Sequence, residues 1–162
     1  MIKVGIITAS DKGSRGERED KSGQVIEEVI AEIEGEVVSY QVVPDEKEVL
    51  KAKMLKMVTE DGVDLLLTTG GTGLAPRDVT PDATLELIER EVPGIAEAMR
   101  MESLQVTDRA MLSRARAGVI KETLIVNLPG SPKAVQECLE VVIPALPHAV
   151  ELIKDEVEDC AR

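Results

Sequence analysis

Short apolar runs alternate with amphipathic stretches along the first half of the chain. Segments 3–8, 36–43 and 63–67 are rich in Val, Ile and Leu, and the run at 63–67 contains no alternating polar positions. Such a run is typical of a strand buried on both faces of a mostly parallel sheet. Residues 24–33, between the first two strands, form one apolar helical face with Val25, Ile26, Val29, Ile30 and Ile33.

A second helix is expected from Asp45 to about residue 60, because Asp45 and Glu48 have the spacing of a capping box. Strand, helix, strand, helix and strand therefore follow one another through short links. This order predicts right-handed crossovers and a parallel sheet.

The second half of the chain continues the pattern. It predicts helices over 81–90, 95–106 and from 132 onward, two final helices separated near Pro144 and Pro147, and strands at 119–120 and 123–128. The short link between these two strands leaves room for an antiparallel pair. In the segment 151–159, five acidic residues against Lys154 indicate a solvated helical face.

The loop that follows the strand at 63–67 contains the largest group of residues suited to binding a ligand. Gly70, Gly71 and Gly73 can take positive φ and leave room for close approach, so consecutive backbone N–H groups could point at an anion. Thr80 before Pro81 has the pattern of a helix N-cap with proline at the first helical position. This loop is a candidate phosphate cradle at the sheet edge where α/β folds bind ligands. GGTG alone would also suit a plain connection, since it matches neither common phosphate fingerprint.

Polar segments follow the other strands as well. Ser10 and Asp11 begin a loop of about fifteen residues, a length that is usually functional or mobile, although its charges also suit a solvated loop. Asp45 follows the second strand and could cap the next helix, which is worth roughly 1 kcal/mol. Ser131 follows the last strand, with Pro132 as the first helical residue. It could also simply cap a helix that carries an exposed lysine.

Arg77 and Asp78, in the same loop, are the charged pair that most specifically suggests a function. Beside a phosphate cradle, a carboxylate can hold Mg²⁺ and a guanidinium can bind a phosphoryl oxygen with two hydrogen bonds. The simpler alternatives are a surface ion pair of little energetic worth, or an Asp78 side chain that ties down the turn. Asp82 is expected to favour the helix dipole from the first turn.

Composition narrows the possible partners. A formal charge of −12 and the absence of Phe and Trp argue against nucleic acid, which needs basic contacts and aromatic stacking. Cys138, Cys160 and the single His148 do not have the spacing of a zinc site, so both cysteines are expected to be thiols. No signal peptide or membrane span is evident, which favours the cytoplasm. A core without Phe or Trp gives less buried area per residue, so we expect oligomerisation.

Several motifs together resemble one known family. TTGGTG and RDVTPDAT at 68–73 and 77–84, VPDE at 43–46, LSR at 112–114 and NLPGSPKAV at 127–135 resemble the MogA/MoaB-type molybdopterin-binding family. The loop after the first strand matches the family's SD-x-x-S-x-G-x-x-x-D-x-SG segment. Arg18 stands where the family often has an aromatic residue, which leaves a stacking role there in doubt.

The resemblance implies a single domain over 1–162, folded as a three-layer α/β/α sandwich with a mostly parallel sheet and assembled as a homotrimer or hexamer. It implies molybdopterin adenylyltransferase activity: Mg-ATP and molybdopterin would give adenylylated molybdopterin and pyrophosphate, with possible contact to the molybdenum-insertion protein. Asp45 and Asp78 would be the catalytic, Mg²⁺-holding residues. The implied substrate-binding residues are Ser10, Asp11, Ser14, Asp20, Ser22, Gly23, Thr69, Gly70, Gly71, Thr72, Gly73, Arg77, Ser113, Arg114, Pro129, Gly130 and Ser131.

Two other functions stay open at this point. A protein of the same fold could bind molybdopterin as a carrier or scaffold without turnover, or it could act on another phosphorylated substrate with a nucleotide. Retention of both Asp45 and Asp78 favours the enzyme, because a carrier for an anionic pterin gains nothing electrostatically from two carboxylates.

Overall fold

The computed structural model describes residues 1–156 and contains a six-stranded sheet in the order β2-β1-β3-β6-β5-β4. Strands β1 (Ile2–Ala9), β2 (Gly35–Val43), β3 (Leu65–Thr69) and β6 (Thr123–Leu128) run parallel. Strand β5 (Ala117–Ile120) is antiparallel to β6, and β4 (Arg90–Glu91) is antiparallel to β5. The predicted mostly parallel sheet is confirmed, including the antiparallel pair.

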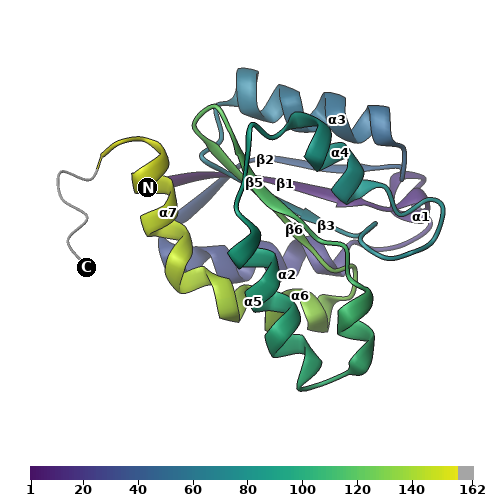
Figure 1. Cartoon of the computed structure of the whole chain (residues 1–162). Coiled ribbons are helices and arrows are strands. Elements are labelled where there is room, and N and C mark those ends of the chain that lie inside the picture. The colour runs from purple at the N-terminus through teal and green to yellow at the C-terminus, as the bar shows by residue number, and fades with distance from the viewer. Residues whose placement is uncertain (157–162) are drawn as a thin grey trace.

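Helices cover both faces of this sheet (Figure 1). One face carries α3 (Lys47–Lys56) and α4 (Thr80–Leu87), with a π-helical turn, η2 (Met57–Asp61), after α3. The other face carries α2 (Lys21–Ile30), α5 (Pro93–Leu104), α6 (Pro132–Val142) and α7 (Leu146–Ile153). The short elements are α1 (Asp11–Ser14), η1 (Ala31–Ile33), η3 (Asp108–Leu112) and η4 (Ile143–Ala145). The expected three-layer α/β/α sandwich is the observed architecture.

Alternation along the central strand produces the two hydrophobic cores. Side chains on a strand point to opposite faces in turn, so Leu65 and Leu67 pack with α2, α5, α6 and α7, while Leu66 packs with α3 and α4. All three leucines are fully buried. Burial on both faces explains why this strand shows no polar alternation in the sequence.

The helix boundaries correct several expectations. Asp45 does not cap α3, whose N-cap is Glu46 with no side-chain hydrogen bond. Thr80 is the first residue of α4 rather than its cap, which is Val79. Strand β4 was not predicted, because its two residues lie in a segment assigned partly to a helix. Ser131 does cap α6 as predicted, since its Oγ accepts the N–H of Ala134 at 3.2 Å.

The end of the chain and its cysteines complete the comparison. Helix α7 ends at Ile153, so residues 154–156 are not part of the helical face that was predicted over 151–159. The remainder of that prediction, and Cys160, lie outside the described part of the chain. Cys138 is a thiol as expected, and its burial raises its pKa. In the described residues no helix is long and apolar enough to cross a membrane.

Candidate active site

A cleft of about 800 Å³ opens at the carboxyl ends of β1 and β3, beside the loop that follows β6. Its floor comes from strand ends and the glycine-rich loop, and one wall comes from the loop between β1 and α2. Ten of the predicted site residues line this cleft: Ser10, Asp20, Ser22, Asp45, Thr69, Gly70, Gly71, Asp78, Gly130 and Ser131. Segments far apart in the sequence therefore meet where an open parallel sheet binds its ligands.

The glycine-rich loop requires its glycines for two reasons. Gly70 and Gly71 have φ values of 89° and 69°, a conformation that side chains disfavour. A Cβ on Gly70 would lie 2.4 Å from the carbonyl oxygen of Ala9, and one on Gly71 would lie 2.4 Å from Oγ1 of Thr80. Glycine thus allows the loop to pack directly against β1 and α4 beneath the cleft.

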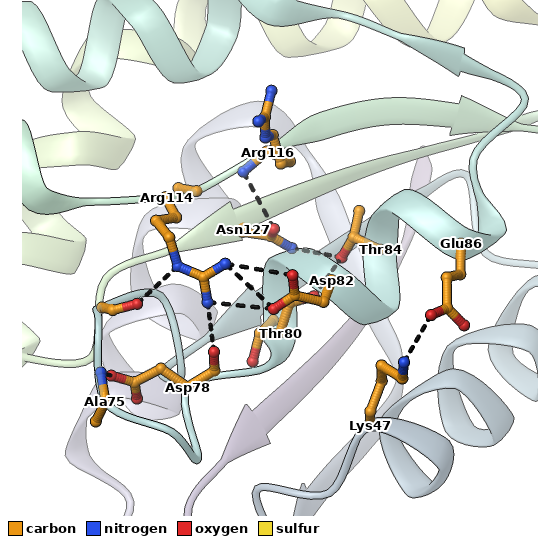
Figure 2. Close-up of polar contacts among 12 residues, drawn as sticks. Lys47, Ala75, Asp78, Thr80, Asp82, Thr84, Glu86, Arg114, Arg116 and Asn127 are labelled. Carbon is orange, nitrogen blue, oxygen red and sulfur yellow. Dashed lines mark hydrogen bonds and ion pairs between the residues drawn. The ribbon is translucent and has the colours of Figure 1, made fainter.

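Arg114 and Thr80 fix the direction of this loop's peptide groups. The carbonyl of Gly71 accepts the N–H of Thr80 at 3.2 Å, and that of Thr72 accepts the N–H of Arg114 at 2.8 Å. Nε of Arg114 donates to the carbonyl of Gly73 at 2.8 Å (Figure 2). Because the N–H and C=O of a trans peptide point in opposite directions, the N–H groups of Thr72, Gly73 and Leu74 point away from Thr80 and Arg114. They are candidate anion donors.

Arg114 stabilises the glycine-rich loop through hydrogen bonds and does not line the cleft. Its guanidinium also donates to the backbone carbonyl of Asp78 at 2.5 Å and to the carboxylate of Asp82 at 3.2 Å (Figure 2). Asp82 had been expected only to favour the helix dipole. Arg114, in the segment that precedes β5, therefore joins the loop to α4 through four acceptors: the carbonyls of Thr72, Gly73 and Asp78 and the carboxylate of Asp82.

Asp45 is half-buried at the cleft wall. Its Oδ2 accepts the backbone N–H of Asp11 at 3.0 Å, while no hydrogen bond to Oδ1 is found among the described residues. Burial is the main reason that the pKa of Asp45 is raised, and repulsion from the charges of Asp11 and Asp78 raises it further. The two predicted catalytic carboxylates are thus close enough to interact.

Asp78 lies beside Gly73, since a Cβ on that glycine would lie 2.8 Å from Oδ2 of Asp78. Its Oδ2 accepts the N–H of Ala75 at 2.9 Å (Figure 2), so its carboxylate ties down the turn as the simpler alternative proposed. Asp78 also lines the cleft. One carboxylate can do both, because each of its oxygens can accept more than one hydrogen bond.

Arg77 pairs with Asp11, not with its neighbour Asp78. Nε and Nη2 of Arg77 donate to Oδ2 and Oδ1 of Asp11 at 2.6 and 2.8 Å. This two-bond contact is the main reason that the pKa of Asp11 is lowered to about 2. Neither side chain lines the cleft.

Asp20 is held by Thr8, Tyr40 and Gly23, of which only Gly23 was among the predicted site residues. Its Oδ2 accepts hydrogen bonds from the hydroxyl of Tyr40 and, at 2.6 Å, from that of Thr8, while Oδ1 accepts the N–H of Gly23 at 3.0 Å. Burial and this carboxylate together raise the pKa of Tyr40. Tyr40 is the only aromatic residue in the chain, which is the one signal that could have singled it out.

The remaining predicted residues lie around the cleft. Thr72, Gly73, Ser113 and Pro129 line a second cavity of about 280 Å³ that shares the glycine-rich loop as a wall. Asp11, Ser14, Gly23, Arg77 and Arg114 line neither cavity. Seven cleft residues were absent from the prediction: Thr8, Ala9, Gly13, Arg18, Glu19, Lys21 and Pro132.

Charged side chains of both signs line the cleft. The segment of the cleft wall that carries Arg18 and Lys21 also carries Glu19 and Asp20. Asp45 and Asp78 add two further carboxylates from other segments. A ligand with both phosphates and a bound divalent cation could use both kinds of charge.

The donor set fits Mg²⁺ that arrives with a nucleotide. Within residues 1–156 no group of three or more His, Cys, Asp and Glu side chains could enclose a metal ion. Mg²⁺ in nucleotide sites is usually held by one or two carboxylates together with phosphate oxygens and water. Asp45 and Asp78 can supply those carboxylates.

The fold and cleft define an α/β protein with a ligand-binding cleft at the carboxyl edge of its sheet, and the comparisons identify its family. A family model described as "Probable molybdopterin binding domain" matches residues 5–148. The chain belongs to this molybdopterin-binding family.

Three relatives illustrate the similarity. The chain is 46% identical to a Helicobacter pylori (strain J99) protein named molybdopterin adenylyltransferase, over 94% of this chain and 88% of that one. The structure of the molybdopterin biosynthesis enzyme MoaB from Thermus thermophilus is 54% identical, with a TM-score of 0.91 over 96% of this chain and 98% of that one. The Pyrococcus furiosus MoaB, described as a tungsten cofactor synthesizing protein, is 36% identical with a TM-score of 0.88 over 95% and 98%.

Proposed function

We propose that this protein is a molybdopterin adenylyltransferase that transfers AMP from Mg-ATP to the terminal phosphate of molybdopterin. The observation that carries the proposal is the cleft itself, which Asp45 and Asp78 line together with Gly70 and Gly71 of the glycine-rich loop. Relatives of this chain at 41–46% identity carry the name molybdopterin adenylyltransferase.

The reaction balances without an enzyme-bound intermediate. A phosphate oxygen of molybdopterin attacks the α-phosphorus of ATP, and the bond from that phosphorus to the oxygen leading to the β-phosphate breaks. Pyrophosphate leaves with the electron pair of that bond. The protein must bring two polyanions together in line, so its contribution is positioning and electrostatic stabilisation.

Asp45 and Asp78 would hold the nucleotide's metal and align the triphosphate. When bound, Mg²⁺ supplies the positive charge that offsets the charge accumulating on pyrophosphate. The half-buried state of Asp45 helps here, because a carboxylate that has lost part of its hydration gains more from a cation.

Backbone donors and two basic side chains would hold the phosphates. Backbone N–H groups of the glycine-rich loop would face phosphoryl oxygens, and Arg18 and Lys21 would offset phosphate charge from the segment that also carries Glu19 and Asp20. Ser10, Ser22 and Ser131 supply hydroxyls or a helix start nearby. Arg114 would act through the loop that it braces, and Ser113 would contact a ligand only through the second cavity.

Release of pyrophosphate from ATP tests this proposal. Purified protein would be incubated with ATP, with and without molybdopterin, in Mg²⁺ and in EDTA. The expected result is release that requires both molybdopterin and Mg²⁺. Tight binding of molybdopterin with no release would contradict the enzyme and indicate a carrier or scaffold. Release with other phosphate esters in place of molybdopterin would indicate a different substrate.

We propose further that the protein is a homotrimer, or a hexamer built from trimers, in the cytoplasm. Support comes from apolar side chains exposed on α5, η3 and the segment between them, namely Met101, Leu104, Val106, Met111 and Leu112. Exposed apolar surface of this kind marks interaction sites. Light scattering would measure the mass, and a clean monomer would contradict this part. The adenylylated product would then pass to a molybdenum-insertion protein.

A further inference from the structure

Asp11 and Asp45 are linked by a pair of reciprocal hydrogen bonds. The backbone N–H of Asp11 donates to Oδ2 of Asp45 at 3.0 Å, and the backbone N–H of Asp45 donates to Oδ1 of Asp11 at 3.0 Å. Each carboxylate therefore fixes the other residue's main chain. The start of α1 and the turn after β2, 34 residues apart in the sequence, are held in one relative position.

Arg77, from a third segment of the chain, binds the carboxylate of Asp11. Its guanidinium makes two hydrogen bonds to Asp11, across 66 residues of sequence. Oδ1 of Asp11 thus accepts from both Arg77 and the N–H of Asp45. A planar guanidinium binds a carboxylate in a defined orientation, so it restricts rotation of the Asp11 side chain.

The arrangement determines which oxygen of Asp45 is available to a ligand. Oδ2 is used by the N–H of Asp11, whereas Oδ1 lies 3.3 Å from the position that a Cβ on Gly71 would take. The N–H of residue 11 holds Oδ2, and the carboxylate of Asp11 holds the main chain from which the Asp45 side chain extends. Asp11 therefore keeps the unpaired oxygen of Asp45 directed toward the glycine-rich loop.

We propose that Asp11 is a positioning residue for Asp45, and that Arg77 acts by locking Asp11 rather than by contacting substrate phosphates. The proposal rests on the proposed function, in which Asp45 holds Mg-ATP. It assigns to Asp11 and Arg77 a role different from the substrate contact that the sequence suggested, and it agrees with the absence of both side chains from the cleft lining.

A surface ion pair alone would not have this effect. Arg77 is 58% exposed, and an isolated pair of that kind contributes little to stability. Here, however, the carboxylate of the pair also accepts the N–H of Asp45. Partners that orient a metal-holding group in this way typically change activity or metal affinity by about 10- to 100-fold when removed.

Amide hydrogen exchange tests the geometry independently of turnover. In the wild type, the N–H groups of Asp45 and Asp11 should both exchange slowly. Asp11→Ala should speed exchange at Asp45, whereas Asp11→Asn, which keeps a carbonyl oxygen as acceptor, should preserve most of the protection. Unchanged exchange at Asp45 in Asp11→Ala would overturn the proposal.

Steady-state kinetics of Asp11→Ala, Arg77→Gln and the double variant test the role. Asp11→Ala should lower kcat by about 10- to 100-fold with the KM for molybdopterin unchanged. The double variant should be no slower than Asp11→Ala, because Arg77 acts through Asp11. Multiplied losses, or a raised KM for ATP in Arg77→Gln with kcat retained, would overturn the proposal by showing direct substrate contact.

Arg116→Gln is the matched control. Arg116 makes a similar exposed pair, with Glu91 at 2.6 Å, on the antiparallel edge of the sheet and away from the cleft. It should leave kcat and the exchange at Asp45 unchanged. If the wild type shows no turnover, the proposed function fails, while the exchange measurement still decides whether Asp11 positions Asp45.

Discussion

Asp11 and Asp45 hold each other through their backbones, each carboxylate accepting the other's N–H at 3.0 Å. This contact explains why Asp45 does not cap α3 although its sequence context suggests that it should. Its carboxylate is directed to the loop after β1, where the cleft begins. A side chain that leaves a local capping role for a distant contact is typical of a functional site.

Asp45→Asn should stabilise the protein at neutral pH while abolishing turnover. Burial raises the pKa of Asp45 in the folded state above its ordinary value of 3.8. The folded protein therefore favours the protonated carboxyl, and wild-type stability falls as pH rises through the raised pKa. Asparagine cannot ionise and keeps an acceptor for the N–H of Asp11.

Thermal unfolding in EDTA from pH 3 to 8 would measure this effect. The advantage of Asp45→Asn should grow as pH rises and vanish below the ordinary pKa of the carboxyl. An advantage that is the same at every pH would show that charge at Asp45 is not the cause.

Thr80→Val should leave the free energy of unfolding unchanged or raise it by about 1 kcal/mol. Oγ1 of Thr80 is the buried side-chain polar atom without a partner in the described part of the chain, and valine has nearly the same shape. Thr84→Val is the matched control on the same helix. Its hydroxyl donates to the carbonyl of Thr80 and accepts from Nδ2 of Asn127 (Figure 2), so its loss should cost about 1–3 kcal/mol.

Urea denaturation of both variants would compare them. If Thr80→Val lost as much stability as Thr84→Val, the Thr80 hydroxyl would have a partner, such as a buried water, in solution.

Gly70→Ala should lower stability by about 1–3 kcal/mol, because a φ of 89° is strained for any residue with a side chain. The new Cβ would also meet the backbone oxygen of Ala9 at 2.4 Å. Gly94→Ala in α5 is the control, since a Cβ there meets nothing within 4 Å. It should be stabilising by about 0.5–1 kcal/mol, and equal losses in the two variants would contradict the assigned geometry.

Asp78→Asn should lose turnover by at least about 10-fold while keeping affinity for molybdopterin. The amide still accepts the N–H of Ala75 through its oxygen, so the turn should persist. Calorimetric titration of molybdopterin, alongside pyrophosphate release, would separate the two effects. A loss of pterin affinity without a change in kcat would assign Asp78 to the pterin instead.

The sequence predicted the sheet and the position of the cleft well, because both depend on local patterns. Buried runs such as 63–67 mark the strands, and polar residues after strand ends mark the ligand-binding edge. Contacts across long sequence separations were not predictable. The partner of Arg77 is 66 residues away rather than adjacent, and Arg114 reaches carbonyls that no side-chain pattern reveals.

The contacts of Tyr40 and Thr8 with Asp20 were also not predictable from the sequence. Both hold Asp20 in place, yet each lies within a strand and follows the ordinary composition of strands. Only the three-dimensional arrangement shows that Asp20, expected to contact substrate, already accepts three hydrogen bonds from the protein.

The most direct test of the proposed function is to follow the α-phosphorus of ATP. Protein would be incubated with molybdopterin, Mg²⁺ and ATP labelled at either the α- or the γ-phosphorus, and the products would be separated. The account predicts α-label in the pterin product and γ-label only in pyrophosphate, with both products formed at least about 10-fold more slowly by Asp78→Asn. Label from the γ-position in the pterin, or no transfer of α-label, would contradict it.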